Sequence, residues 1–87
     1  MRNLEPEQKK EIIQKNLDSI GVLSSSFMGG VFFVKASDEK TFEKDFMKNL
    51  SSSMVSYLES KNLNPQSHNR GLTYSIVNKG KDFTINF

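Results

Sequence analysis

The chain contains one histidine, His68, which lies in a polar segment close to an arginine and is followed by two lysines. A histidine can act as a general acid or base, and cations can stabilise the strained phosphate group during cleavage of RNA. The residues that combine these properties are His68, Arg70, Lys79 and Lys81. They predict either a nucleic-acid-binding region over residues 68–81 or, as a weaker alternative, a minimal ribonuclease centred on His68. A solvated loop explains the same segment without any chemistry. In that case we expect His68→Ala to leave both the fold and the activity of the protein nearly unchanged.

Other catalytic chemistry finds little support in the residue types. A zinc site needs several cysteine, histidine or carboxylate ligands, and the chain has no cysteine and a single histidine. No glycine-rich phosphate-binding motif is present. Residues 37–40, Ser-Asp-Glu-Lys, match the serine–lysine spacing of β-lactamases, but Ser37 is predicted to cap a helix instead. We therefore expect no catalytic residue, no metal and no cofactor, and a protein that is not an enzyme.

A second group of cations recurs at four-residue intervals. Lys40, Lys44 and Lys48 share one face of a predicted helix, where they are placed to contact phosphates or an acidic protein. Acidic residues lie among them, so this face is mixed in charge. The whole chain has 12 basic and 10 acidic side chains, a net charge of +2. Such a balance favours a protein partner over nucleic acid, which selects clustered positive charge.

The first half of the chain predicts a helix followed by a hairpin. Residues 6–20 place apolar side chains on one helical face, with Pro6 at the first position and Gly21 as the C-cap. Residues 22–28 and 31–36 then form two apolar runs around Gly29-Gly30, which is typical of a two-residue turn. The second run is apolar on both faces, so we expect its strand to be central in the sheet.

The second half repeats this order of elements. A 3.6-residue period of apolar side chains predicts a helix over residues 38–61, with Ser37 as its N-cap. This helix is longer than any strand of the hairpins, so it either overhangs the sheet or breaks at the weak helix formers Ser51-Ser52-Ser53. A polar loop over residues 62–71 leads to a second hairpin, residues 72–78 and 82–87, around Lys79-Gly80.

These elements predict one α+β domain over residues 1–87, in the order α-β-β-α-β-β. Its four strands form an antiparallel sheet covered on one face by the two helices. The first residues are charged and lack the apolar stretch of a signal peptide, and the longest uncharged run contains several serines and glycines. We therefore expect a cytoplasmic protein with no membrane contact.

A non-catalytic protein-binding module, such as an inhibitor, adaptor or regulatory subunit, is the function that these patterns favour. The final strand carries Phe83, Ile85 and Phe87 with no charge after Asp82, which predicts an open sheet edge that pairs with another strand. The lysine face of the long helix is the other predicted contact surface. The small core and the overhanging helix add to the expectation of a homodimer. The alternative is the nucleic-acid-binding protein described above.

Overall fold

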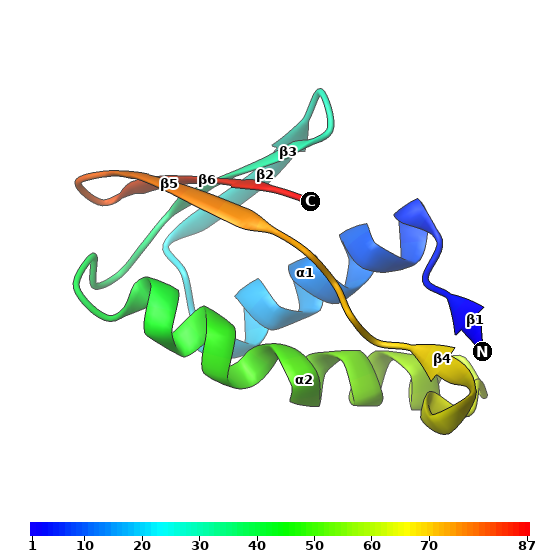
Figure 1. Ribbon diagram of the computed structural model, residues 1–87. Helices are drawn as coiled ribbons and strands as arrows, with labels where there is room; N and C mark the ends of the chain where they lie inside the picture. Colours follow the sequence, from blue (N-terminus) through cyan, green and yellow to red (C-terminus); the bar gives the residue numbers. More distant parts are fainter.

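The computed structural model describes residues 1–87 and confirms the predicted α+β class. Helix α1 (Pro6–Ile20) and helix α2 (Phe42–Ser60) lie on the same face of a four-stranded antiparallel sheet (Figure 1). The strands are β2 (Ser24–Met28), β3 (Val31–Lys35), β5 (Ser75–Lys79) and β6 (Asp82–Asn86), in the spatial order β2-β3-β6-β5. The face of the sheet turned away from the helices carries no other element.

Local sequence signals fix the ends of α1 and the first hairpin. Pro6 occupies the first helical position, and the Glu5 backbone N–H donates to Gln8 Oε1 at 2.8 Å. The helix ends at Gly21, whose φ of 75° is left-handed. Gly29 and Gly30, with φ of 59° and 81°, form the turn between β2 and β3. The predicted bounds of α1 and the predicted turn are therefore confirmed.

The order of the strands corrects one prediction and confirms another. Strand β3 lies between β2 and β6, as its two apolar faces indicate. Strand β6 lies between β3 and β5, with Phe32 opposite Ile85 and Ile76 on the other side of Ile85. The prediction that the final strand is an open edge is therefore wrong. The free edges belong to β2 and β5.

The core lies between the helices and the inner face of the sheet. Phe32, Phe83 and Ile85 project from the two central strands and have exposed fractions of 0–1%. The Phe83 ring packs on Phe42 of α2, with 4.4 Å between ring centroids. Sixteen buried apolar residues form one continuous cluster, which fits a single small domain.

Helix α2 starts later than predicted and does not break. It begins at Phe42, because Ser37 donates its hydroxyl to the Gly21 carbonyl at 2.7 Å instead of capping the helix. The residues between form a turn in which the Lys40 backbone N–H donates to Asp38 Oδ1. Through residues 51–53 the helix is continuous, so the predicted overhang is confirmed and the predicted break is wrong.

The overhanging end of α2 is covered by the segment that follows it. This segment contains a 3₁₀ turn, η1 (Pro65–Ser67), and a short strand, β4 (His68–Asn69), which pairs in parallel with β1 (Arg2–Asn3). Leu72 is buried and Leu63 is half-buried against the core. The end of α2 is thus covered within the chain, and its length no longer argues for a second copy.

No helix of the structure combines the length and the apolar character needed to cross a membrane.

Candidate functional site

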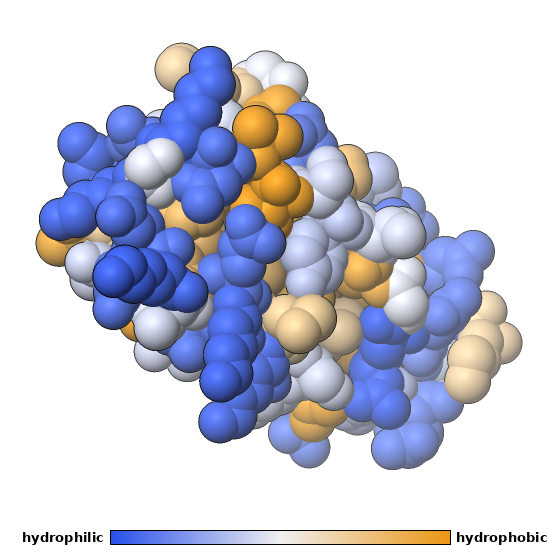
Figure 2. Space-filling model, turned by 60° about the vertical axis from the view of Figure 1, so that its left-hand side comes forward, coloured by the Kyte–Doolittle hydropathy of each residue, from blue (hydrophilic) through white to orange (hydrophobic).

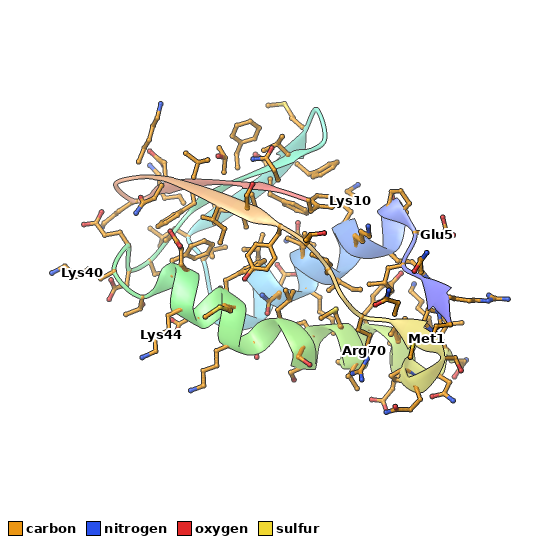
Figure 3. All side chains as sticks on the ribbon, in the orientation of Figure 1. Met1, Glu5, Lys10, Lys40, Lys44 and Arg70 are labelled. Carbon is orange, nitrogen blue, oxygen red and sulfur yellow. The ribbon has the colours of Figure 1, made fainter.

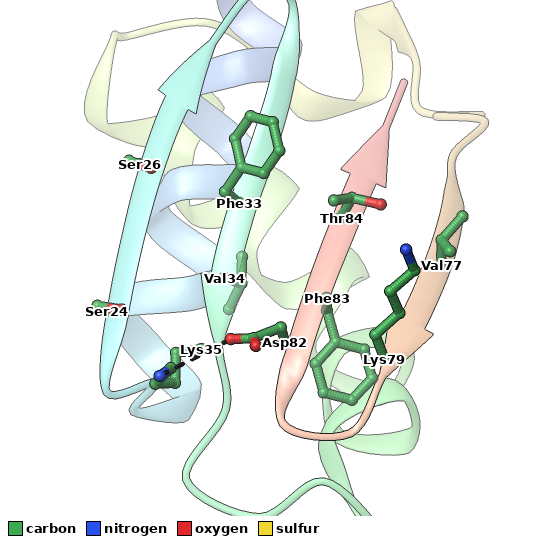
Figure 4. A pocket seen from close by; sticks show the side chains of 10 residues that line it. All are labelled: Ser24, Ser26, Phe33, Val34, Lys35, Val77, Lys79, Asp82, Phe83 and Thr84. Carbon is green, nitrogen blue, oxygen red and sulfur yellow. Dashed lines mark ion pairs between the residues drawn. The ribbon is translucent and has the colours of Figure 1, made fainter.

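The open face of the sheet, which is the face turned away from the helices, carries the large apolar side chains of the strands that are exposed. Phe33 on β3 and Val77 on β5 are 43% and 52% exposed, and Met28 at the end of β2 is 66% exposed. Phe33 and Val77 line a shallow hollow of about 410 Å³ across all four strands (Figure 4). Scattered exposed apolar residues are normal on a small protein, but these share one face that no helix covers.

Both signs of charge border this hollow. Lys35 Nζ lies 3.9 Å from Asp82 Oδ1, joining the adjacent strands β3 and β6 (Figure 4). Both side chains are more than half exposed, so the pair adds little to stability. Lys79 also lines the hollow from the end of β5. The flank shown in Figure 2 is mainly hydrophilic, with hydrophobic surface in separate patches.

Strand β2 presents a free edge with no charge along it. Its sequence is Ser24-Ser25-Ser26-Phe27-Met28, and its only strand partner is β3. Met28 and Val31 are register partners that flank the two-residue turn, and in such a hairpin the flanking residues form the hydrogen-bonded pair. By alternation, Ser25 and Phe27 direct their backbone N–H and C=O groups outward. No backbone hydrogen bond outside the regular elements involves residues 24–28. The opposite edge, β5, ends in Lys79, the kind of residue that discourages strand pairing.

The predicted contact residues of the final strand are not available at the surface. Phe83 and Ile85 are 1% and 0% exposed. Phe87 is half-buried, and its ring lies 5.9 Å from the rings of Phe27 and Phe32. All three side chains face the core, because alternate residues of β6 point to the helices and Phe87, directly after the strand, continues this alternation. Their assignment as a binding surface therefore rested on the wrong strand order.

The three lysines of the predicted helix face are exposed at one end of the molecule. Lys40 precedes α2, while Lys44 and Lys48 lie on it. Figure 3 shows Lys40 and Lys44 pointing outward, away from the sheet. None of the three forms an ion pair. They remain free to bind an acidic partner.

The predicted basic cluster of residues 68–81 is divided in space. His68 and Arg70 lie in and next to β4, beside the N-terminus, whereas Lys79 and Lys81 lie at the turn between β5 and β6 (Figures 1 and 3). These two regions are at opposite ends of a molecule whose longest extent is 38 Å. The four side chains therefore do not form one phosphate site.

His68 itself is 5% exposed, so its interpretation as part of a solvated loop is wrong. Its Nδ1 lies 3.0 Å from the Asn64 carbonyl oxygen. Because a carbonyl only accepts, Nδ1 carries the proton in the neutral ring. Strand β4, which begins at His68, pairs with β1, and this pairing places Arg2 beside His68. A polar hollow of about 460 Å³, lined also by Glu5 and Gln8, adjoins the ring.

The structural role of His68 leads to a specific prediction. We expect His68→Ala to lower the free energy of unfolding by about 1–3 kcal/mol, because it removes a partly buried hydrogen bond and the packing of a buried side chain. His68→Asn is the matched control, since its amide N–H can replace the Nδ1 donor to Asn64 and should recover most of the loss. Urea denaturation of the three proteins measures both effects. Equal losses in the two variants would show that the hydrogen bond is not what stabilises this segment.

The packing of α1 on α2 contains two polar contacts that the sequence did not reveal. Burial, together with a hydrogen bond to the Glu11 carboxylate, raises the pKa of Tyr57 to about 12. Asn16, with no exposed surface, donates to the Phe46 carbonyl at 2.9 Å and accepts from Asn49 and Ser53 at 2.8 and 2.9 Å. The one available signal was a polar Asn16 beside Leu17 in an otherwise apolar helix face. We interpret both contacts as part of the packing of the helices, because the polar groups of each contact form hydrogen bonds with other groups of α1 and α2.

No group of three or more histidine, cysteine or carboxylate side chains is placed to hold a metal ion. No family model, curated protein or solved structure matches the chain. Its surfaces therefore have to be interpreted from their own geometry.

Proposed function

We propose that this protein is a non-catalytic protein-binding module that receives an extended strand of a partner along β2. The observation that carries the proposal is the free edge of β2, which is uncharged over its five residues and bonded only to β3. An added strand takes its affinity from main-chain hydrogen bonds and its specificity from alternate side-chain contacts. Met28 on β2 and Phe33 on the adjacent strand β3, both exposed on the open face beside this edge, provide apolar surface for such contacts.

The proposal is tested by removing the outward-facing donor of Ser25. Proline is tolerated in an edge strand where its missing N–H faces solvent, so Ser25→Pro should fold while losing a hydrogen bond to the added strand. Asn78→Pro is the matched control, because Asn78 occupies the corresponding outward position on β5. We expect peptides selected from a displayed random library on the native chain to bind Ser25→Pro at least about tenfold more weakly and Asn78→Pro unchanged.

Two results would contradict this proposal. If the selected peptides bind Ser25→Pro and Asn78→Pro equally well, the contact surface is not the edge of β2. Tight binding of a single-stranded oligonucleotide, weakening steeply as salt is raised and lost when Lys44 and Lys48 are replaced by glutamine, supports the nucleic-acid alternative instead. Circular dichroism of each variant establishes that it folds before its binding is compared.

A further inference from the structure

The residues of β2 are arranged so that the strand complements itself. We infer that the edge of β2 pairs with β2 of a second copy, antiparallel and about a two-fold axis at Ser26. This inference rests on the proposed function and names the partner of the same edge. In such a symmetric dimer one surface serves both copies, and each sheet would continue into the other across the axis.

The direction of the backbone groups limits the register to few choices. Only Ser25 and Phe27 turn their N–H and C=O groups outward. With the axis at Ser26, Ser25 of one copy faces Phe27 of the other, and each of these pairs exchanges two N–H···O=C bonds. Every outward-facing group of β2 then has a partner, and all five residues of the strand are paired.

The other two symmetric registers are disfavoured by contacts within the chain. An axis at Ser25 would oppose Phe27 with Leu23, but the Leu23 backbone N–H is already bonded to the Lys35 carbonyl at 2.9 Å. An axis at Phe27 would bring together two Phe27 side chains, each of which carries Lys10 Nζ at 4.8 Å from its ring centroid. Two like charges would then approach each other. The axis at Ser26 avoids both problems.

Side-chain size matches in the register with the axis at Ser26. On the open face Ser24 lies opposite Met28, and Ser26 lies opposite its own copy. On the helix face Ser25 lies opposite Phe27. Each large side chain thus meets a serine, and no charged residue is present in the strand. Such small-to-large pairing lets the two strands approach without a steric clash.

Helix α1 is also compatible with this axis. Lys10 lies over Phe27, and Gln14 donates to Ser25 Oγ at 3.2 Å and to Asp18 Oδ1 at 3.0 Å. Because Phe27 faces Ser25 across the axis, Lys10 of one copy lies at the level of Gln14 of the other and approaches the end that carries Asp18. Each Lys10 therefore lies opposite the neutral Gln14 of the other copy, and the two lysines do not face each other.

A single engineered cysteine tests this register in a chain that otherwise has none. Opposite residues of a pair that is not hydrogen-bonded have Cα atoms about 4.5 Å apart, within reach of a disulfide. Two Ser24 residues would be separated by four residue steps, about 13 Å. We expect Ser26→Cys to form an intermolecular disulfide under mild oxidation at least about tenfold faster than Ser24→Cys. Ser75→Cys, equally on the open face but on the β5 edge, is the second control.

The outcomes separate this inference from the proposed function. Equal rates for the three cysteine variants, or a faster Ser24→Cys, would overturn the register at Ser26. A native chain that remains monomeric in sedimentation equilibrium up to high micromolar concentration would overturn self-pairing. If that monomer still selects peptides whose binding is weakened by Ser25→Pro, the edge binds another protein and the proposed function stands. If it selects none, both fail.

Discussion

Replacing Phe32 with alanine is expected to lower the free energy of unfolding by about 3–5 kcal/mol. Phe32 has no exposed surface and lies on the central strand β3, with its ring centroid 4.8 Å from that of Phe27 and 5.9 Å from that of Phe87. Removing the ring leaves a cavity between the sheet and the helices that rigid strands cannot close. A domain of this size has a total stability of about 5–15 kcal/mol, so the variant would lose a large part of it.

The neighbouring residue provides the control for this prediction. Phe33 is on the same strand but on the opposite face, and 43% of it is exposed. We expect Phe33→Ala to cost less than about 1 kcal/mol, because a side chain already in contact with water loses little transfer free energy. Urea denaturation followed by circular dichroism compares the two variants. Similar losses at both positions would mean that the open face is covered in solution, for example by a second copy.

Replacing Asn16 with leucine is expected to cost about 3 kcal/mol, although it makes the helix interface more apolar. Asn16 is the common partner of Phe46, Asn49 and Ser53. Its loss leaves the buried Ser53 hydroxyl without its acceptor on α1, and the branched leucine side chain does not fit the planar space of an amide. Denaturation in urea measures the loss directly.

A double-mutant cycle distinguishes these two causes. Ser53→Ala alone should cost less than about 1 kcal/mol, because Asn16 keeps its bonds to Phe46 and Asn49. In the background of Asn16→Leu, the Ser53 oxygen still accepts from Asn49 Nδ2 at 3.3 Å, but the hydroxyl proton has lost its acceptor. Removing this hydroxyl should then restore part of the stability. Strict additivity of the two substitutions would indicate that the loss comes from packing of the leucine and not from the broken hydrogen bonds.

The parts of the fold that the sequence predicts well are those determined by neighbouring residues. Pro6 and Gly21 mark the ends of α1, and Gly29-Gly30 marks the turn between β2 and β3, because helix ends and tight turns depend on local backbone conformation. The apolar periods of 3.6 and 2 residues also identify α2 and the strands, because each period is set by residues that are close in sequence. Ser37 shows the limit of this approach, since its hydroxyl finds the Gly21 carbonyl, sixteen positions away.

The errors concern contacts between distant segments. The alternation of Phe83, Thr84 and Ile85 shows that β6 has one wet face, but it is the same for a central strand and for an edge strand of this sheet. Only the pairing with β3, across about half the chain, decides between them. The polar neighbours of His68 indicate a solvated loop, whereas the residue is buried and begins a strand that pairs with β1 near the other end of the chain. The uncharged free edge is therefore that of β2, whereas β6 is a central strand.

The central position of β6 has a consequence for the newly synthesised chain. Strand β3 contains Val31-Phe32-Phe33-Val34 and is translated 51 residues before the end of β6, which covers its second edge. At a typical elongation rate of 5–20 residues per second, this edge of β3 stays unpaired for roughly 3–10 s until β6 has been synthesised. During this interval an uncharged, β-branched and aromatic segment is open to pairing with other nascent chains. Ribosomes that stall before residue 82 would release a product of this aggregation-prone kind.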